Sequence, residues 1–442
     1  MQDPQIIEAD WTWTGARFEQ GIQVVISTDG CIQHVGALDA KPTCKLSHQA
    51  LLPGMINAHS HAFQRGLRGL GETFPDHRGS FWSWRESMYE LVERLDPNTF
   101  RCLCERAFRE MLAAGITTVG EFHYLHHADK ASQDFQFDTI LLEAARQVGI
   151  RLVLLNACYN AGGIGQALNG AQKRFATPTT DAYWRQMDRL AACLDPHTQT
   201  LGVAAHSIRA AKLDDIVSLH EEARRRGLVF HMHVEEQRRE IDECMQAYGK
   251  PPMRTLLDRL EIGANFTAIH GTHTDPADLA SFLKAGGNVC LCPLTEANLG
   301  DGIADVPGIR AANGNICAGT DSNARICMTE ELRWLEYVQR LRREHRGVCV
   351  DDAGRVANAL WRIATLNGAR SLGLRTGKIE PGYLADFIAV DLATPSLAGW
   401  NAETLLAGFI LGTGNEAVVG TCVGGRWVYG RNAMLPSLGV SR

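Results

Sequence analysis

The chain has 442 residues, of which 45% are hydrophobic and 21% charged, and its formal net charge is −6. This is an ordinary globular composition, and the acidic balance excludes a basic surface for nucleic acid. No apolar run approaches the roughly 18 residues that a membrane helix needs, so no membrane partner is expected. The thirteen cysteines form no CxxC pair, and their odd number argues against a secreted disulfide framework. Met1-Gln2-Asp3-Pro4 shows no leader pattern. We expect a cytoplasmic protein.

Both ends of the chain read as short strands separated by Gly and Asp turn signals. At the N-terminal end these strands are Ile6–Trp11, Gln23–Ile26 and Ile32–Gly36. At the C-terminal end they are Phe387–Asp391, Glu416–Val419 and Gly424–Tyr429. Two β-rich ends around one long middle predict that residues 1–52 and 376–442 together form a small β-sandwich domain.

The middle of the chain, residues 53–375, alternates strand-like with helix-like runs such as Phe100–Ala114 and Leu213–Arg226. Eight strands are predicted: Leu51–Ile56, Ile116–Val119, Arg151–Leu155, Leu201–Ala205, Leu228–Phe230, Phe266–Ile269, Asn288–Leu291 and Asn315–Ala318. Eight βα units predict an α/β fold, a TIM-like (β/α)8 barrel with insertions. An open doubly wound sheet would also alternate, but it would not explain polar motifs at four separate strand ends.

Histidine and aspartate motifs follow these strands. His59 and His61 lie two residues apart and therefore on one face of a strand, so both imidazoles can reach the same ion. His233 ends a second strand and could supply a third nitrogen, and Asp321 ends the last one and could supply an oxygen. Three nitrogens and one carboxylate with room for water are typical of an open, catalytic metal site.

Further polar groups surround this set. Glu236 follows His233 on the loop and could shuttle protons, as could His270, whereas Glu235 is expected in solvent. His231 is expected to be a satisfied barrel histidine. Barrel hydrolases that hold two metal ions bridge these ions with a carbamylated lysine at the end of the fourth strand. Here that strand ends Ala204-Ala205-His206-Ser207, and Lys212 comes too late. A mononuclear site that activates water is predicted.

Longer motifs resemble one family. They are Leu52-Pro53-Gly54-Met55-Ile56-Asn57-Ala58-His59-Ser60-His61-Ala62-Phe63-Gln64-Arg65, Phe81-Trp82-Ser83-Trp84-Arg85-Glu86-Ser87-Met88-Tyr89, Glu121-Phe122-His123-Tyr124-Leu125-His126-His127, His206-Ser207-Ile208-Arg209, and Thr295-Glu296-Ala297-Asn298-Leu299-Gly300-Asp301-Gly302. With these motifs the chain resembles the amidohydrolase superfamily, and within it the formimidoylglutamate deiminase family, nearly from end to end.

The resemblance implies hydrolysis of N-formimidoyl-L-glutamate to N-formyl-L-glutamate and ammonia, a step of histidine degradation. It implies one Zn²⁺ per subunit on His59, His61, His233 and Asp321, with Fe²⁺ or another divalent ion as the alternative. Glu236, His270 and Asp321 would be catalytic: Asp321 would accept a proton from water, and Glu236 would protonate the leaving nitrogen. The implied substrate-binding residues are Gln64, Arg85, Tyr124, His206 and Arg209. The implied partners are a small anionic substrate and a second copy of the chain in a homodimer.

Arg85 and Arg209 suit a substrate with two carboxylates, because arginine binds carboxylates in a bidentate fork. Arg65 and Arg68 are ambiguous and could face solvent. One segment departs from the family, which usually reads Ser-Asp-Ser-His where this chain reads Thr320-Asp321-Ser322-Asn323-Ala324-Arg325. The departure leaves open a related substrate such as the aspartate analogue. The same metal set would also suit an enzyme acting on a heterocyclic amine, and a barrel that binds ligands without catalysis is the rival from outside the enzymes.

Overall fold

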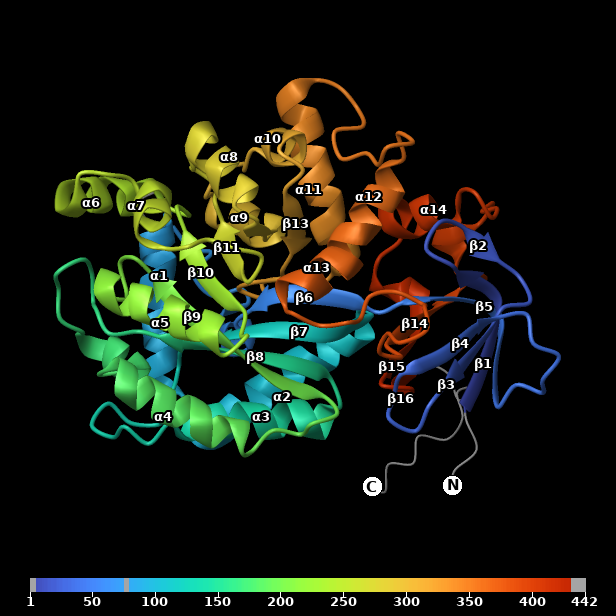
Figure 1. Cartoon of the computed structure of the whole chain (residues 1–442), viewed down its shortest axis with the longest axis horizontal. Helices are drawn as coiled ribbons and strands as arrows, with labels where there is room; N and C mark the ends of the chain where they lie inside the picture. Colours follow the sequence, from blue (N-terminus) through green and yellow to red (C-terminus); the bar gives the residue numbers. More distant parts are fainter. Residues whose placement is uncertain (1–4, 75–78, 431–442) are drawn as a thin grey trace.

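The computed structural model describes residues 5–74 and 79–430. Residues 1–4, where no leader was predicted, and residues 431–442 of the predicted terminal domain lie outside these ranges. The described strands form two separate eight-stranded sheets, and Figure 1 shows the sheet of terminal strands to the right of the helix-covered sheet. None of the described helices is long and apolar enough to cross a membrane.

The larger sheet is all parallel and follows chain order from β6 to β13. A bridge between Ser60 and Asp321 brings its first and last strands together, so the sheet closes into the predicted (β/α)8 barrel and not into an open doubly wound sheet. Its strands are β6 (Met55–Ser60), β7 (Ile116–His123), β8 (Arg151–Cys158), β9 (Gln199–Ser207), β10 (Phe230–Val234), β11 (Phe266–His270), β12 (Asn288–Leu291) and β13 (Asn315–Ala318).

Helices surround the barrel in Figure 1 and bury their apolar faces against it. The predicted helical runs include Phe100–Ala114 and Leu213–Arg226, which correspond to α2 (Pro97–Ala113) and α5 (Leu213–Arg225). The helices are α1 (Phe81–Arg94), α2 (Pro97–Ala113), α3 (Gln136–Val148), α4 (Thr180–Ala191), α5 (Leu213–Arg225), α6 (Arg238–Tyr248), α7 (Pro252–Arg259), α8 (Pro276–Lys284), α9 (Pro293–Leu299), α10 (Val306–Ala311), α11 (Met328–Arg343), α12 (Val356–Arg362), α13 (Gly368–Ser371) and α14 (Leu405–Gly412).

The smaller sheet is mixed and joins the two ends of the chain, as predicted. Its order is β16-β15-β14-β5-β1-β3-β4, with β2 paired to β1. One apolar cluster from both ends of the chain, including Val24, Leu46 and Phe387, packs against it. Its strands are β1 (Gln5–Trp13), β2 (Phe18–Glu19), β3 (Gln23–Ile26), β4 (Ile32–Gly36), β5 (Cys44–Pro53), β14 (Phe387–Asp391), β15 (Val418–Val423) and β16 (Arg426–Gly430).

Six barrel strands lie where they were predicted, whereas β10 begins at Phe230, where the predicted run Leu228–Phe230 ends, and the run Leu51–Ile56 belongs to two sheets. Its first residues end β5 and pair with β14, whereas Met55 begins β6 of the barrel. The change of sheet falls at Gly54, where an added Cβ would lie 2.1 Å from Thr117 Oγ1. Hydrophobic pattern alone cannot divide a continuous apolar run between two buried strands.

Gly319 lets the last strand approach the first. A Cβ there would lie 2.6 Å from the carbonyl oxygen of His59 and 3.0 Å from its amide nitrogen. We expect Gly319→Ala to destabilise the fold by about 1–3 kcal/mol, because backbone atoms cannot move aside as side chains do. Denaturant unfolding checks this against Gly408→Ala, whose Cβ meets only Leu397 Cδ2 at 3.4 Å. Equal stability of the two variants would contradict the packing argument.

Candidate active site

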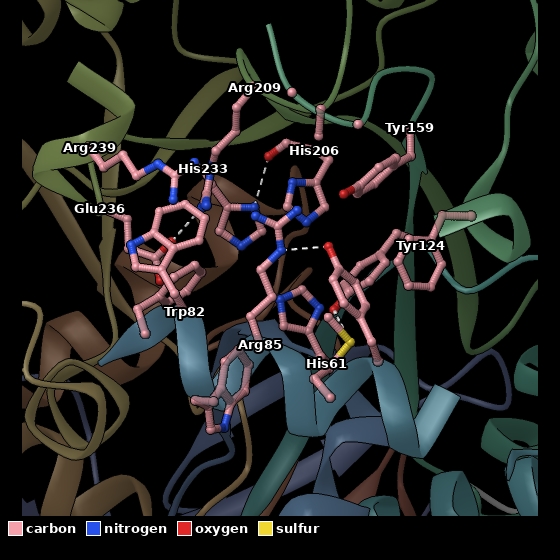
Figure 2. A pocket seen from close by; sticks show the side chains of 18 of the residues that line it. His61, Trp82, Arg85, Tyr124, Tyr159, His206, Arg209, His233, Glu236 and Arg239 are labelled. Carbon is pink, nitrogen blue, oxygen red and sulfur yellow. Dashed lines mark hydrogen bonds and ion pairs between the residues drawn. The ribbon is translucent and has the colours of Figure 1, made fainter. Parts of the chain in front are cut away.

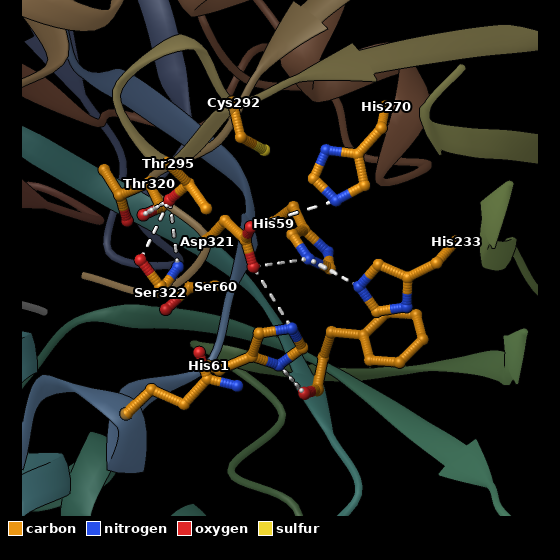
Figure 3. A network of polar contacts seen from close by, with 12 residues as sticks. His59, Ser60, His61, His233, His270, Cys292, Thr295, Thr320, Asp321 and Ser322 are labelled. Atoms are coloured by element: carbon orange, nitrogen blue, oxygen red, sulfur yellow. Dashed lines mark hydrogen bonds and ion pairs between the residues drawn. The ribbon is translucent and has the colours of Figure 1, made fainter. Parts of the chain in front are cut away.

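Three imidazoles and one carboxylate converge at the carboxyl end of the barrel. One ligand atom from each of His59, His61, His233 and Asp321 lies within 4.8 Å of the others, and all four residues are buried. Asp321 Oδ1 is 3.3 Å from His59 Nε2 and 3.2 Å from His61 Nε2, and His233 Nε2 is 3.2 Å from His59 Nε2. Figure 3 shows the four side chains pointing toward one another. The structure thus brings together the four predicted ligands.

The protonation of these groups fits a cation. His61 Nδ1 lies 2.7 Å from Phe122 O, and His233 Nδ1 lies 2.8 Å from His206 O. A backbone carbonyl can only accept, so each Nδ1 carries the proton and each Nε2 presents a lone pair to the centre. Burial lowers the pKa of His59 to about 3 and that of His233 well below its usual value, so both rings are neutral. The Nε2 lone pairs that face the centre lie close enough to repel one another unless a cation lies between them.

His270 and Glu236 lie beside this cluster. His270 Nε2 is 3.8 Å from both Asp321 Oδ2 and Glu236 Oε1, and its Nδ1 is 3.2 Å from Glu296 Oε1. Burial alone would lower the pKa of His270, but the surrounding carboxylates, Glu236 first, raise it to about 10. Burial would likewise raise the pKa of Asp321, but the neighbouring imidazoles of His59 and His61 hold it well below its usual range.

The strand ends that carry this chemistry have unusual backbone conformations. Glu235, His270, Asp321 and Asn323 all have positive φ, between 44° and 71°. Such a conformation is uncommon outside glycine and is tolerated best by Asn and Asp. It tends to cluster at functional sites, where the surrounding structure holds it in place.

A cavity of about 810 Å³, its open mouth included, reaches down to His61, His233 and Asp321. All five predicted substrate-binding residues line it, and Figure 2 shows most of them converging on one space. Gln64 Nε2 donates to Tyr124 Oη at 2.7 Å, and the ring of His206 lies edge-on to those of Tyr124 and Tyr159. Their roles in binding stay predictions.

The two arginines differ in their surroundings. Arg85, on α1, donates from Nε to Tyr89 Oη at 2.5 Å and lies over the rings of Trp82 and Tyr89. Within residues 5–74 and 79–430 no carboxylate forms an ion pair with Arg85, so it is free to receive one. Arg209 is 6% exposed and already pairs with Glu236, from Nη2 to Oε2 at 2.9 Å.

Three further residues, His231, Lys212 and Glu235, were assigned surroundings from the sequence. His231 turns away from the cluster and hydrogen-bonds Ser371 O through Nε2 at 2.9 Å, but its buried Nδ1 has no partner among the described residues, so this barrel histidine is only half satisfied. Lys212 is exposed at the start of α5. The placement of Glu235 in solvent was wrong. Glu235 is 1% exposed and accepts the Met253 amide at 2.9 Å, because its positive φ turns the side chain inward.

Arg65 is partly buried and Arg68 is exposed, and both pair with Glu110 of α2. Arg68 also donates to Asn323 O at 2.9 Å, so it supports the loop after β13. Neither arginine lines the cavity that reaches the metal-type cluster.

The departure from the family at residues 323–325 has a structural explanation. Asn323 is fully buried; its amide donates to Ser60 Oγ at 3.1 Å and to His61 O at 3.0 Å, and its Oδ1 accepts from Thr320 Oγ1 at 2.7 Å. Arg325 is exposed and pairs with Glu330. Neither residue lines the cavity. Asn323 therefore fixes the strand ends on either side of Asp321, and neither Asn323 nor Arg325 contacts the space for substrate.

A second group of histidines, His123 and His126, hydrogen-bonds the buried carboxylate of Asp138. Asp138 Oδ1 is 3.0 Å from His123 Nε2 and 2.8 Å from His126 Nδ1, and its Oδ2 accepts from Asn156 and Gln186. The far nitrogen of His126 meets Ala157 O at 2.8 Å. These groups satisfy one another, so they support the loop that carries Tyr124.

Burial alone would raise the pKa of Asp138, but the imidazoles of His126 and His123 hold that pKa well below its usual range. Asp138→Asn should therefore cost roughly 3–5 kcal/mol at neutral pH, as for one partner of a buried pair. Because the folded-state pKa is depressed, this contribution is present above about pH 4 and is lost as the pH falls further. Urea unfolding of both proteins across pH checks it, and a difference that does not change with pH would contradict it.

Sequence reasoning missed several groups in or behind this cavity. Trp82, Tyr89, Tyr159 and Arg239 line it, and Glu240 lies fully buried behind Arg209. Trp82 and Tyr89 belong to the same family motif as Arg85, so attention to aromatic residues near that arginine could have found them. Nothing local marks Glu240, because its position on α6 resembles a solvent-facing helix site.

Comparisons with known proteins agree with this geometry. The model of the family described as "Amidohydrolase family" matches residues 50–428. The chain is 36% identical to formimidoylglutamate deiminase of Pseudomonas aeruginosa, covering 94% of this chain and 92% of that protein. It is 28% identical to 5-methylthioadenosine/S-adenosylhomocysteine deaminase of Haloquadratum walsbyi, covering 78% and 72%.

Among solved structures, an amidohydrolase from Brucella melitensis superposes with a TM-score of 0.88 at 32% identity, covering 97% of this chain and 96% of that one. An adenosine deaminase from Xanthomonas campestris with bound zinc superposes at 0.81 and 23% identity, covering 98% and 95%, and so shares the fold. Together with the closed barrel and the ligand cluster at its carboxyl end, these matches show that the chain belongs to the amidohydrolase family.

Proposed function

We propose that this protein hydrolyses N-formimidoyl-L-glutamate to N-formyl-L-glutamate and ammonia. The observation that carries the proposal is a single cavity that joins a metal-type cluster at its floor to two arginines on its wall. The substrate has one formamidine group to be hydrolysed and two carboxylates to be bound. The metal-type cluster suits the formamidine group, and the two arginines suit the carboxylates. The 36% identity to a formimidoylglutamate deiminase over nearly the whole chain supports the same reaction.

One Zn²⁺ per chain would be held by His59, His61, His233 and Asp321. Three neutral imidazoles and a carboxylate are the donors that zinc prefers, and iron, cobalt or manganese would also accept them. When bound, the ion supplies Lewis acidity that lowers the pKa of water toward neutrality. The homodimer implied by the resemblance stays a prediction that sedimentation would test.

The remaining steps belong to the side chains. Asp321 accepts the proton of the attacking water, for which its low pKa keeps it ionised. His270, charged between three carboxylates, donates toward the developing negative charge at the attacking oxygen. Glu236, which faces both His270 and the cavity, takes up the second proton of the attacking water and passes it to the leaving nitrogen, which departs as ammonia.

Arg85→Gln should raise KM about 10- to 100-fold, because a charge-assisted hydrogen bond to a substrate carboxylate contributes about 1.5–3 kcal/mol. Stability should change little, since Tyr89 and the aromatic rings are its contacts in the described chain. Steady-state kinetics alongside Arg94→Gln, an exposed arginine of the same helix, checks this. An unchanged KM would remove Arg85 from the binding site.

The test of function is ammonia release from N-formimidoyl-L-glutamate by the zinc-loaded protein, with N-formimidoyl-L-aspartate and 5-methylthioadenosine alongside. Fast release from the glutamate compound is expected. Release only from the aspartate analogue would keep the chemistry and change the substrate. Release only from the nucleoside would mean that the arginines do not bind carboxylates.

A further inference from the structure

A line of alternating charges runs from α6 through the cavity wall to the metal-type cluster. Glu240 Oε2 is 3.6 Å from Arg209 Nε, and Arg209 Nη2 is 2.9 Å from Glu236 Oε2. Glu236 Oε1 and Asp321 Oδ2 are each 3.8 Å from His270 Nε2. All five side chains are buried. Figure 2 shows Arg209 beside Glu236 at the edge of the cavity, and Figure 3 shows His270 above Asp321.

Glu240 has no role in the reaction proposed above. It is 0% exposed, and neither of its carboxylate oxygens has a hydrogen-bond partner in the described parts of the chain. A buried carboxylate is costly unless a cation compensates it, and the cation in contact with Glu240 is Arg209. The guanidinium of Arg209 therefore lies between two carboxylates, one on each side. Phe81 and Trp82 cover it at 5.1 and 5.8 Å.

This arrangement makes Glu236 and a substrate carboxylate compete for the charge of Arg209. Arginine binds a carboxylate best through two parallel N–H groups on one edge of its planar fork. In the structure Nη2 donates one of its two N–H groups to Glu236, and Nε faces Glu240. A substrate carboxylate that binds the remaining N–H groups shares the positive charge of Arg209 with Glu236 and so weakens the contact with Glu236. Glu240 on the Nε side keeps Arg209 charge-compensated and in place during the exchange.

We infer that Arg209 couples recognition to catalysis: a substrate carboxylate withdraws Arg209 from Glu236 and so frees Glu236 to transfer a proton, while Glu240 anchors the guanidinium. Glu240 is then a positioning residue that acts through Arg209. This inference rests on the proposed function and adds to it. The carboxylate of the substrate acts as an activator in addition to being a point of attachment.

The coupling predicts a particular split between kinetic constants. If Arg209 only holds the substrate, removing the carboxylate removes uniform binding, which raises KM and leaves kcat unchanged. If Arg209 also restrains Glu236, a substrate without that carboxylate reacts slowly even at saturation. A free carboxylate that occupies the vacant position would then restore the rate.

The test uses the zinc-loaded wild-type protein and two truncated compounds. N-formimidoyl-4-aminobutyrate lacks the α-carboxylate, and N-formimidoyl-L-2-aminobutyrate lacks the distal one. For the compound that lacks the carboxylate facing Arg209, we expect kcat at least ~10-fold below that of N-formimidoyl-L-glutamate and a saturable stimulation by acetate. Failure of acetate to stimulate either compound, or a kcat unchanged by both truncations, would overturn the coupling.

Two charge-removing substitutions on the same helix separate the role of Glu240 from general effects. Glu240→Gln should lower kcat for the full substrate at least ~10-fold and weaken the stimulation by acetate, whereas Asp242→Asn, exposed on α6, should change kcat less than two-fold. A Glu240→Gln protein that keeps kcat and stimulation would exclude the anchor. Wild-type protein that releases no ammonia from N-formimidoyl-L-glutamate would instead refute the proposed function, so the two failures differ.

Discussion

Replacing Asp321 with asparagine is expected to remove both bound metal and turnover, with activity at least ~10⁴-fold below wild type. Asp321 is the one carboxylate between His59 and His61, and it is also the proposed acceptor of the water proton. Losing a positioned base by itself costs about 10²- to 10⁴-fold, and a weaker metal site adds to that loss. Asparagine tolerates the positive φ of this position, so the backbone should hold.

Metal content per chain and kcat, measured on the same preparations, check this prediction. Asp321 also belongs to an overlapping buried group with His270 and Cys292, so the site needs a second pair of variants to define it. We expect His61→Gln to lose metal and Cys292→Ser to retain it. The reverse result would move the ion toward His270 and contradict the proposed ligand set.

Glu236→Gln should lower kcat by about 10²- to 10⁴-fold while metal content and stability stay near wild type. Glutamine keeps the shape of the side chain but cannot transfer the proton to the leaving nitrogen. Arg209 would still be compensated by Glu240, so the substitution leaves no uncompensated buried cation. Measurements of kcat, metal content and thermal unfolding together distinguish a lost proton shuttle from a damaged fold.

The neighbouring Glu235 provides the matched control. It is equally buried, but it accepts the Met253 amide and does not line the cavity. Glutamine at 235 can accept the same hydrogen bond, so kcat of Glu235→Gln should stay within a few-fold of wild type. Full turnover by Glu236→Gln, or an equal loss in both variants, would remove Glu236 as the proton shuttle.

The barrel and the convergence of the metal-type residues could be predicted from the sequence because both follow from local patterns. Apolar runs of strand length mark the eight barrel strands, and in a parallel barrel all their carboxyl ends meet on one face. Motifs such as His59-Ser60-His61 therefore had to converge with His233 and Asp321. The sheet formed by the two ends of the chain follows from the same patterns.

Other features were decided by tertiary contacts. The change of sheet at Gly54, the burial of Glu235 and the hydrogen bonds of Asn323 depend on neighbours far away in the chain. Glu240 is the clearest case, because only the packing of α6 against the barrel brings it to Arg209. The sequence by itself predicted which polar groups would meet at the carboxyl end of the barrel. The tertiary structure decided which charges compensate one another, since the energy of a buried charge depends on partners in space.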